Sequence, residues 1–596
     1  MPRTTARLAL FLFFLCGAVL ALSAGPAAAE HALRRSDVVF MYDNPAMYEP
    51  YGCTVLGWAG RTDRDHIRQA RDAGVRLFAV SVGFLTEFRR VMDFTDDYLE
   101  AACRNFAGEP FHVPWLVDHE YRGEQPYWWC TNSPLYRKYL DHRLDQAMAA
   151  EPTGLHIDDY RGSAGPVTWR SGGFCRHCLA GFREYLAENV PAERLAELGI
   201  DDLEGFDYRQ FLLDMGVTPE DYNHRRSGLP LAAEFLDYHV RTVTAYVADY
   251  HRRAKEVRGQ PVTLAVNSHV NSPENLAIAP HLSYFCCEVH HGAAQREVPW
   301  HPVYVYKLGD GLDRPVAATA GGYDWAYIKE HDLTGLVRTW TALSYAFGHR
   351  LMAPHRQWCH TPERGTHWYD GPTEEYAWLH RFVRQQERLL DDYEAVAPVA
   401  VVYDNAARRR GRGDVEPIVT ALAQRNVAFT TAVAGDAWLD YLLCEEALAR
   451  FEWVVVHPER NLDDDQQGVL DTVAADGRLL EFAGEETLAA LDGLAVAIEG
   501  ADDVLAVLRE KPADPSAPLV LHLVNRRYDG ERDAMVPQED FTVRIPAAFL
   551  GERQVGTATA HAPREAPIAL ETGRRDDSLV ISIPHLDLWT MVELAP

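Results

Sequence analysis

Positive charge is scarce in this sequence. Its 596 residues carry 58 Lys and Arg against 87 Asp and Glu, a formal net charge of −29. The basic residues form no stripe along the chain. A chain this acidic should repel nucleic acid and anionic membranes. We therefore expect neither as a partner.

Long apolar runs are also rare. The one from Leu8 to Leu22 is shorter than the roughly 20 residues that cross a bilayer. Arg3 and Arg7 precede it, and small residues ending at Ala29 follow it, which is typical of a secretory signal peptide over residues 1–29. We therefore expect an exported protein, secreted or periplasmic.

Cysteine is sparse, with ten in the chain. Removal of Cys16 with the signal peptide leaves an odd number, so at least one thiol is free or metal-bound. A chain this large and apolar does not need a disulfide scaffold. No Gly-rich phosphate loop, no HExxH spacing and no fixed-period repeat is present, which weighs against a nucleotide-binding sheet, a zincin and a solenoid.

Strand-like and helical runs alternate through the first two thirds of the sequence. We expect eight strands over residues 37–44, 75–83, 111–120, 154–159, 262–269, 284–291, 315–321 and 350–358. Helical patterns lie between them, at Thr62–Ala73, Leu231–Val257 and Leu333–Phe347. The pattern predicts a (β/α)8 TIM barrel over residues 30–395, with an open doubly wound sheet as the alternative.

The pattern changes twice after the barrel. Residues 396–505 repeat a strand–helix alternation, predicting a small Rossmann-like α/β domain that lacks a nucleophile elbow. From residue 506 to 596, alternating runs such as LVLHLVN and FTVRIP predict a C-terminal antiparallel β-sandwich.

Paired carboxylates end the expected fourth strand, in the run GLHIDDYRG. Asp158 and Asp159 are costly to bury unless they are paired, hydrogen-bonded or used in catalysis. A helix cap or an ion pair with Arg161 is the structural alternative. Glu288, on the expected sixth strand, is the third catalytic candidate, and a salt bridge to Arg356 is its alternative.

Other polar and aromatic residues lie where they could bind sugar hydroxyls or stack on sugar rings. The substrate-binding candidates are Asp43, Asp118, His119, Glu120, Asn267, His269, His290, Arg356, Trp128 and Trp368. His119 with Glu120, and His290 with His291, could instead ligate a catalytic metal.

Two stretches resemble glycoside hydrolase family 42 β-galactosidases. They are WCTNSPLYRKYLDHRLDQA, from Trp129, and GFCRHCLAGFREYL, from Gly173. The resemblance implies a barrel, a small α/β domain that can mediate trimers or dimers, and a β-sandwich. It places Asp159 where the family has its acid/base Glu, and it leaves the family's strand-seven nucleophile without a counterpart in PVAATAG.

A strand-four Asp with a strand-six carboxylate also resembles retaining barrels of the α-galactosidase type. There the Asp is the nucleophile and the strand-six carboxylate is the acid/base. Strand parity favours Asp158, because it shares a face with His156, whereas the family position favours Asp159. Both remain candidates.

The resemblance extends to cysteines. Cys130, Cys175 and Cys178 are similar to the family's zinc cluster, although Gly173 stands where that cluster has a fourth cysteine. His177 or Cys103 could complete a structural zinc site, and a disulfide from Cys130 to one of the pair is the alternative.

Together these features predict an exported glycoside hydrolase that acts on an oligo- or polysaccharide with no catalytic cofactor, and the resemblance implies a homo-oligomer. One alternative is a polysaccharide lyase or metal-dependent hydrolase. The other is a catalytically inactive glycan-binding barrel whose affinity depends on Trp128, Trp129 or Trp368.

Overall fold

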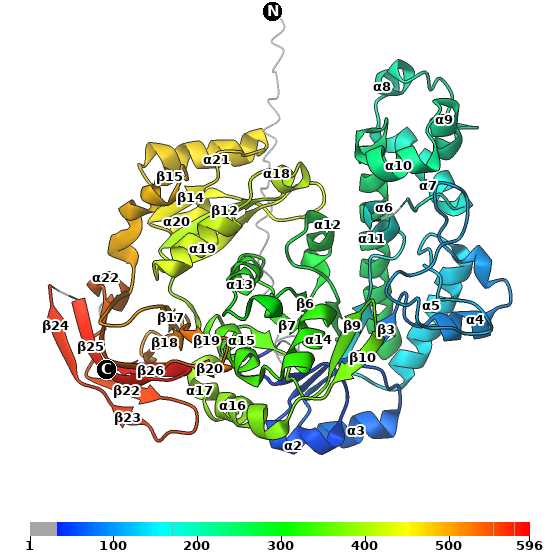
Figure 1. Ribbon diagram of the computed structural model, residues 1–596. Coiled ribbons are helices and arrows are strands. Elements are labelled where there is room, and N and C mark those ends of the chain that lie inside the picture. The colour runs from blue at the N-terminus through cyan, green and yellow to red at the C-terminus, as the bar shows by residue number, and fades with distance from the viewer. Residues whose placement is uncertain (1–32, 170, 552, 577) are drawn as a thin grey trace, which may run out of the picture.

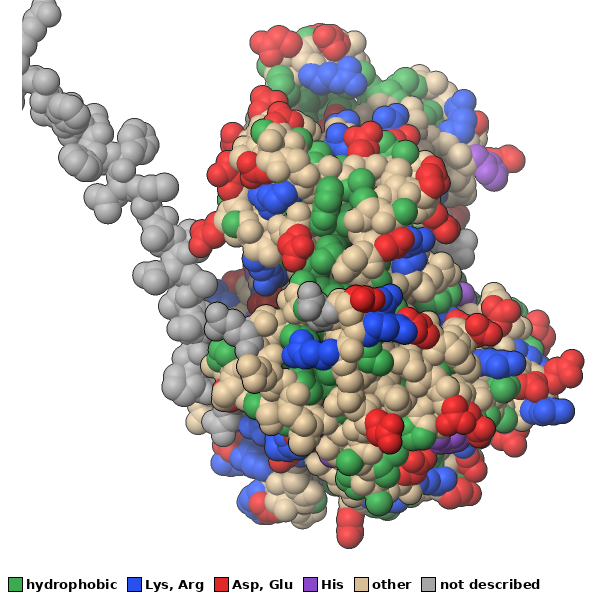
Figure 2. Space-filling model, turned by 90° about the vertical axis from the view of Figure 1, so that its left-hand side faces the viewer, with side chains coloured by type: hydrophobic (Ala, Val, Ile, Leu, Met, Phe, Trp, Pro, Cys, Tyr) green, Lys and Arg blue, Asp and Glu red, His purple; other side chains and the backbone are tan. Residues whose placement is uncertain are grey.

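The computed structural model describes residues 33–169, 171–551, 553–576 and 578–596 (Figure 1). The predicted signal peptide lies outside these ranges. No helix among the described residues combines the length and the apolarity needed to span a membrane. On the face drawn in Figure 2, acidic and basic side chains are interspersed rather than gathered by sign.

Eight parallel strands form the centre of the molecule. Five make one sheet in the order β1 (Val39–Phe40), β2 (Val55–Ala59), β3 (Leu77–Gly83), β4 (Gly154–Asp158) and β5 (Thr263–Val266). Three make a second, in the order β6 (Phe285–Val289), β7 (Val316–Ala320) and β8 (Arg350–Leu351).

Backbone hydrogen bonds join the two sheets at both edges. The amide of Ser283 donates to the carbonyl of Leu264 at 2.9 Å, between β5 and β6. The amide of Ala353, just after β8, donates to the carbonyl of Val39 on β1 at 2.8 Å. The strands therefore close into a barrel, which leaves no free sheet edge at these positions.

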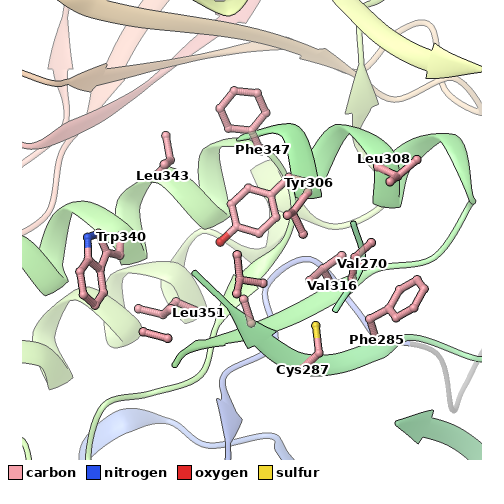
Figure 3. Close-up of a cluster of buried hydrophobic side chains, with 14 of the residues drawn as sticks. Val270, Phe285, Cys287, Tyr306, Leu308, Val316, Trp340, Leu343, Phe347 and Leu351 are labelled. Carbon is pink, nitrogen blue, oxygen red and sulfur yellow. The ribbon is translucent and has the colours of Figure 1, made fainter. Parts of the chain in front are cut away.

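Side chains alternate between the inside of the barrel and its outer wall, as the period of two in a strand requires. One buried cluster, with Val39, Leu77, Ala265, Cys286 and Ala317, fills the inside. The neighbouring positions face outward and pack on helices. Figure 3 shows this on the β6–β7–β8 side, where the side chains come from the strands and from α13 (His301–Gly311) and α15 (Thr334–Ala346).

Two strand predictions fail, and they cancel in the count. The predicted eighth strand over 350–358 is also shorter than expected, since β8 ends at Leu351. β2 was not predicted, because its sequence VLGWA is short and Gly57 interrupts its apolar pattern. The predicted strand over 111–120 is wrong, since that segment forms turns and isolated bridges between β3 and α5 (Pro134–Ala149). Pro114 supplies no amide hydrogen for a ladder at its centre.

A helical insertion follows β4 and stands beside the barrel (Figure 1). It runs through the helices α6 (Ala164–Trp169), α7 (Arg176–Asn189), α8 (Ala192–Glu197), α9 (Tyr208–Asp214), α10 (Pro219–Arg225) and α11 (Ala232–Arg258). The insertion has its own aromatic core, in which Phe182, Tyr208 and Phe235 are buried. α11 returns the chain to β5, and it lies within one residue of the predicted helix.

After the barrel comes a four-stranded parallel sheet in the order β13 (Phe429–Ala434), β12 (Val399–Asp404), β14 (Trp453–Val456) and β15 (Leu479–Glu481). Two of its helices are α19 (Glu416–Gln424) and α21 (Asp464–Ala475). Its strands read as apolar runs because helices cover a parallel sheet on its faces.

Two antiparallel sheets make up the C-terminal region. One joins β11 (Glu394–Ala395), β17 (Val504–Glu510), β18 (Leu519–Asn525), β26 (Trp589–Ala595), β22 (Thr557–His561) and β23 (Ile568–Ala569). The other joins β16 (Ala497–Glu499), β21 (Gln538–Ile545), β25 (Ser578–Leu586) and β24 (Thr572–Arg575). These sheets therefore begin before residue 506 and include the short strand β11.

Truncating a side chain on the outer wall of the barrel should destabilise the protein. Phe285 is fully buried in the cluster of Figure 3, so we expect Phe285→Ala to cost about 3–5 kcal/mol through lost burial and a new cavity. Leu442→Ala is the control, because Leu442 is 73% exposed and its truncation should change stability by less than about 0.5 kcal/mol. Thermal and denaturant unfolding would measure both, and equal effects would contradict this packing.

Candidate active site

A cavity of about 1080 Å³ opens at the carboxyl ends of the barrel strands. This is the end at which (β/α)8 barrels build their active sites. Eight of the candidate residues line it: Asp158, Asp159, Glu288, His119, Asn267, His269, Trp128 and Trp368.

Asp158 faces this cavity because of its register on β4. His156, two residues earlier, is fully buried inside the barrel, with its ring nitrogens 3.2 Å from Ser81 Oγ and 3.3 Å from the carbonyl of Cys286. Since alternate residues share a face, Asp158 projects inward one layer higher, at the mouth. Its carboxylate accepts hydrogen bonds from Asn267 Nδ2 at 3.2 Å and Thr86 Oγ1 at 3.3 Å.

Glu288 reaches the same cavity from β6, two residues beyond the inward-facing Cys286. Its backbone amide donates to Asn267 Oδ1 at 3.4 Å. The Asn267 amide thus touches both strands, donating to the Asp158 carboxylate and accepting from the Glu288 backbone. This bridge ties the carboxylate at the end of β4 to the backbone of β6, and both acids line the barrel mouth.

Burial raises the pKa of both acids. The pKa of Asp158 is raised to about 6, chiefly by desolvation, against the lowering effect of the hydrogen bonds from Asn267 and Thr86. The pKa of Glu288 is raised to about 8, first by desolvation and then by the charges of Asp158 and Asp324, against the lowering effect of a hydrogen bond from the Asn267 side chain. Two nearby carboxyl groups with separated pKa values can share a proton near neutral pH, with Glu288 as the acid.

Asp159 lies beside them in an unusual backbone conformation. Its φ is +52°, in the left-handed region that Asp tolerates better than most residues. Desolvation, together with the charges of Asp158 and Glu288, holds the pKa of Asp159 well above its usual range, while Arg161 lowers it. The turn keeps the Asp159 side chain at the cavity although it directly follows an inward-facing residue.

Five of the substrate-binding candidates lie outside the cavity lining. Asp43 is held by Tyr48 OH and His66 Nε2, each at 2.5 Å. The Asp118 carboxylate accepts a hydrogen bond from the amide of Thr366 at 2.8 Å. Arg356 forms an ion pair with Asp370 at 2.7 Å rather than with Glu288.

The other two point toward solvent. Glu120 is exposed. The side chain of His290 is 73% exposed and lies 3.6 Å from Asp324. Glu120 and His290 were also members of the two candidate metal pairs, His119–Glu120 and His290–His291.

The cavity also has a wall of which the sequence analysis anticipated only Trp368. A hairpin of β9 (Gln357–Thr361) and β10 (Gly365–Tyr369) follows β8 and presents Trp358, His360, Thr366 and Trp368 to the cavity. The alternation of aromatic and polar residues in QWCHT and GTHWY is the sequence pattern that could have indicated it. Further lining residues are Tyr42, Trp58, Ser81, Trp115 and Tyr323, and Trp58 was missed with its strand, β2.

The aromatic candidates differ in their surroundings. Trp128 is only 2% exposed, and its Nε1 donates to the carbonyl of Gly162 at 2.7 Å, so it contributes an edge to the cavity wall. Trp129 is fully buried core. Trp368 is half-buried, packed edge-on against Tyr42 at 4.9 Å with the Arg356 guanidinium 4.4 Å from its ring centre.

Three of the cysteines gather away from the cavity. The sulfur atoms of Cys130, Cys175 and Cys178 are each 3.4 Å from the other two, and all three residues are buried. No disulfide is formed by the nine cysteines among the described residues. A disulfide needs about 2.05 Å between one pair of sulfurs, whereas three equal separations suit thiolates around a single ion, so the group fits a tetrahedral metal.

Comparisons with known proteins agree with this architecture. No family model matches the chain. An alpha-agarase of Alteromonas agarilytica is 25% identical over 94% of this chain, and one of Thalassotalea agarivorans is 26% identical over 78% of it. The chain spans 41% and 32% of the lengths of these two relatives.

Solved structures share the fold at 12% identity and 94% coverage of this chain. They include alpha-L-fucosidase isoenzyme 2 of Paenibacillus thiaminolyticus, with a TM-score of 0.60 over its whole length. The beta-galactosidase of Bacillus circulans sp. alkalophilus has a TM-score of 0.59 over 99% of its length. This chain therefore shares the fold of these two enzymes. The expectation of a barrel-type fold with mixed α/β content is confirmed.

Proposed function

We propose that this chain is an exported glycoside hydrolase that cleaves a polysaccharide at the mouth of its barrel. The observation that carries the proposal is the placement of Asp158 and Glu288 on either side of Asn267, inside a cavity lined by aromatic rings. Glycoside hydrolysis requires one carboxylic acid and one carboxylate flanking the scissile bond.

The electrostatics favour one division of the two roles. Glu288, with its pKa near 8, keeps its proton at neutral pH and donates it to the oxygen of the leaving sugar. Asp158, with its pKa near 6, is ionised and either attacks the anomeric carbon or activates a water. Asn267 orients Asp158 through the hydrogen bond to its carboxylate, and the charges of Asp158 and Asp324 help to keep Glu288 protonated.

The relatives favour an agar-type galactan as substrate. Both are named alpha-agarase, and the first aligns with nearly all of this chain. The flat, half-buried ring of Trp368 and the wall formed by Trp58, Trp115 and Trp358 suit stacking on sugar faces. The acidic chain suits a neutral polysaccharide better than an anionic one.

We also infer a distant relationship to glycoside hydrolase family 42 with a reassigned catalytic pair. The cysteine group, the barrel and the following α/β sheet support the relationship, whereas the acids lie on β4 and β6 rather than on β4 and β7. A structural zinc on Cys130, Cys175 and Cys178 belongs to the same proposal. It would tie the loop before α5 to the start of α7, and it takes no part in bond cleavage.

The carboxylate pair can be tested by substitution. We expect Asp158→Asn and Glu288→Gln each to lower kcat on agarose by about 10²–10⁴-fold, because each removes one acid/base partner. Asp159→Asn should cost less than Asp158→Asn. Glu120→Gln is the control, since Glu120 is exposed outside the cavity.

Reducing-end assays and product chromatography over a polysaccharide panel would measure these effects. Full activity in all three cavity variants would overturn the assignment. Binding without turnover by the unmodified protein would favour a glycan-binding barrel, and unsaturated products would favour a lyase.

The pH profile follows from the same pair. Activity should rise with pH as Asp158 loses its proton near pH 6, and fall as Glu288 loses its proton near pH 8. Asn267→Ala removes hydrogen bonds that lower both pKa values, so both limbs of the kcat/KM profile should move to higher pH. If neither limb of the kcat/KM profile moves in Asn267→Ala, Asn267 does not set the pKa values of Asp158 and Glu288.

The zinc can be tested by metal analysis. We expect about one zinc per chain in protein purified without chelator, and its loss in Cys130→Ser and Cys175→Ser, with a lower Tm. Cys444→Ser is the matched control, because Cys444 is not one of the three clustered cysteines. A loss of two titratable thiols in the denatured, unreduced protein would indicate a disulfide instead.

A further inference from the structure

The group formed by Cys130, Cys175 and Cys178, called here the three-cysteine cluster, would supply three of the four ligands of a tetrahedral ion. Structural zinc sites are almost always closed by four protein ligands. Among the described residues, the metal-ligand group with atoms near enough to share an ion contains these three sulfurs and no fourth residue. The inference below rests on the proposed zinc and asks which side chain completes it.

His239 is a buried imidazole without a partner. It lies on α11 and is fully buried, yet neither Nδ1 nor Nε2 has a hydrogen-bond partner among the described residues. Buried polar groups are nearly always paired, and one that is not indicates a missing water or ion. Phe235 and Tyr238 pack edge-on against the ring at 4.6 and 4.9 Å, so an apolar wall surrounds it on those sides.

The free edge of this ring lies against the segment that leads to Cys175. A Cβ atom on Gly173 would lie 2.8 Å from His239 Nε2, so glycine leaves space at that nitrogen. The same turn of α11 also approaches the cluster at Tyr238, whose hydroxyl accepts a hydrogen bond from Asn132 Nδ2 at 3.3 Å. Asn132 Nδ2 lies 3.5 Å from the sulfur of Cys178.

We propose that His239, whose ring nitrogens lie outside this group in the present structure, turns toward the three-cysteine cluster when zinc binds and supplies the fourth ligand. The result is a Cys3His zinc site that joins α11 to the cluster. Imidazole nitrogen is a standard zinc ligand, and Cys3His is a common structural set. Coordination would give His239 the partner it lacks. It would also fix the long helix of the insertion to the loop before α5, behind the wall of the cavity.

Two other side chains could compete. Cys103 is buried beside Cys130. Its thiol already has a hydrogen-bond partner in Cys130, however, whereas both nitrogens of His239 have none in the part of the chain that the structure describes. His177 follows Arg176, whose guanidinium Nε lies 3.4 Å from its Nε2, on a more exposed part of α7. The buried imidazole of His239, with both nitrogens unpaired in that part of the chain, therefore indicates a missing metal ion more strongly than Cys103 or His177 does.

X-ray absorption at the zinc edge of the purified full chain would test this. We expect three sulfurs at about 2.3 Å and one nitrogen at about 2.0–2.1 Å. In protein loaded with Co²⁺, the visible ligand-field band should shift in His239→Gln and move to longer wavelength in His239→Cys. Zinc retention against a chelator should fall about 10–100-fold or more in His239→Gln, by analogy with the loss of a metal-site contact.

Cys103→Ser and His177→Gln are the matched controls, and both should keep the unmodified spectrum and zinc retention. A four-sulfur shell that becomes three-sulfur in Cys103→Ser would overturn the assignment of His239. A spectrum unaffected by His239→Gln but altered by His177→Gln would overturn it as well. Absence of zinc from the unmodified protein would refute the zinc site itself and leave the assignment of Asp158 and Glu288 untouched.

Discussion

The amide of Asn267 ties together the two strand ends that carry the acids. It donates to Asp158 on β4 and accepts from the backbone of Glu288 on β6, so one neutral side chain spans two strands of the barrel. Burial makes both acids harder to ionise, and the second more than the first. The result is one protonated and one ionised carboxyl group near neutral pH, which is the state that acid–base cleavage requires.

The walls around this pair come from segments far apart in the sequence. Asp118, before β4, accepts from the backbone of Thr366 on the hairpin after β8, 248 residues away. The helical insertion and the cysteine group support the segments on the other side. Loops carry the binding surface, while the barrel below, packed from both faces, provides the rigid floor.

Periodicity predicted the parts of the fold that depend on local pattern. The strands carrying Asp158, Asn267 and Glu288 were recognised because apolar residues precede each polar end, and parity placed Asp158 inward. The segment around Asp118 was misjudged because an apolar run with polar ends looks the same whether it pairs in a sheet or folds into turns. β2 was missed because five residues interrupted by glycine carry little periodic information.

By itself, the sequence determined the alternating architecture, the acids at the strand ends and the identity of the clustered thiols, since these depend on residue type and short-range spacing. Only the tertiary structure decided which polar residues share the cavity. In that structure Asp43, Asp118 and Arg356 bind other protein groups outside the cavity lining, and the hairpin with Trp358 and Trp368 forms a wall of the cavity. It also placed His239 beside Gly173. These outcomes depend on contacts between residues distant in the chain, which no local pattern records.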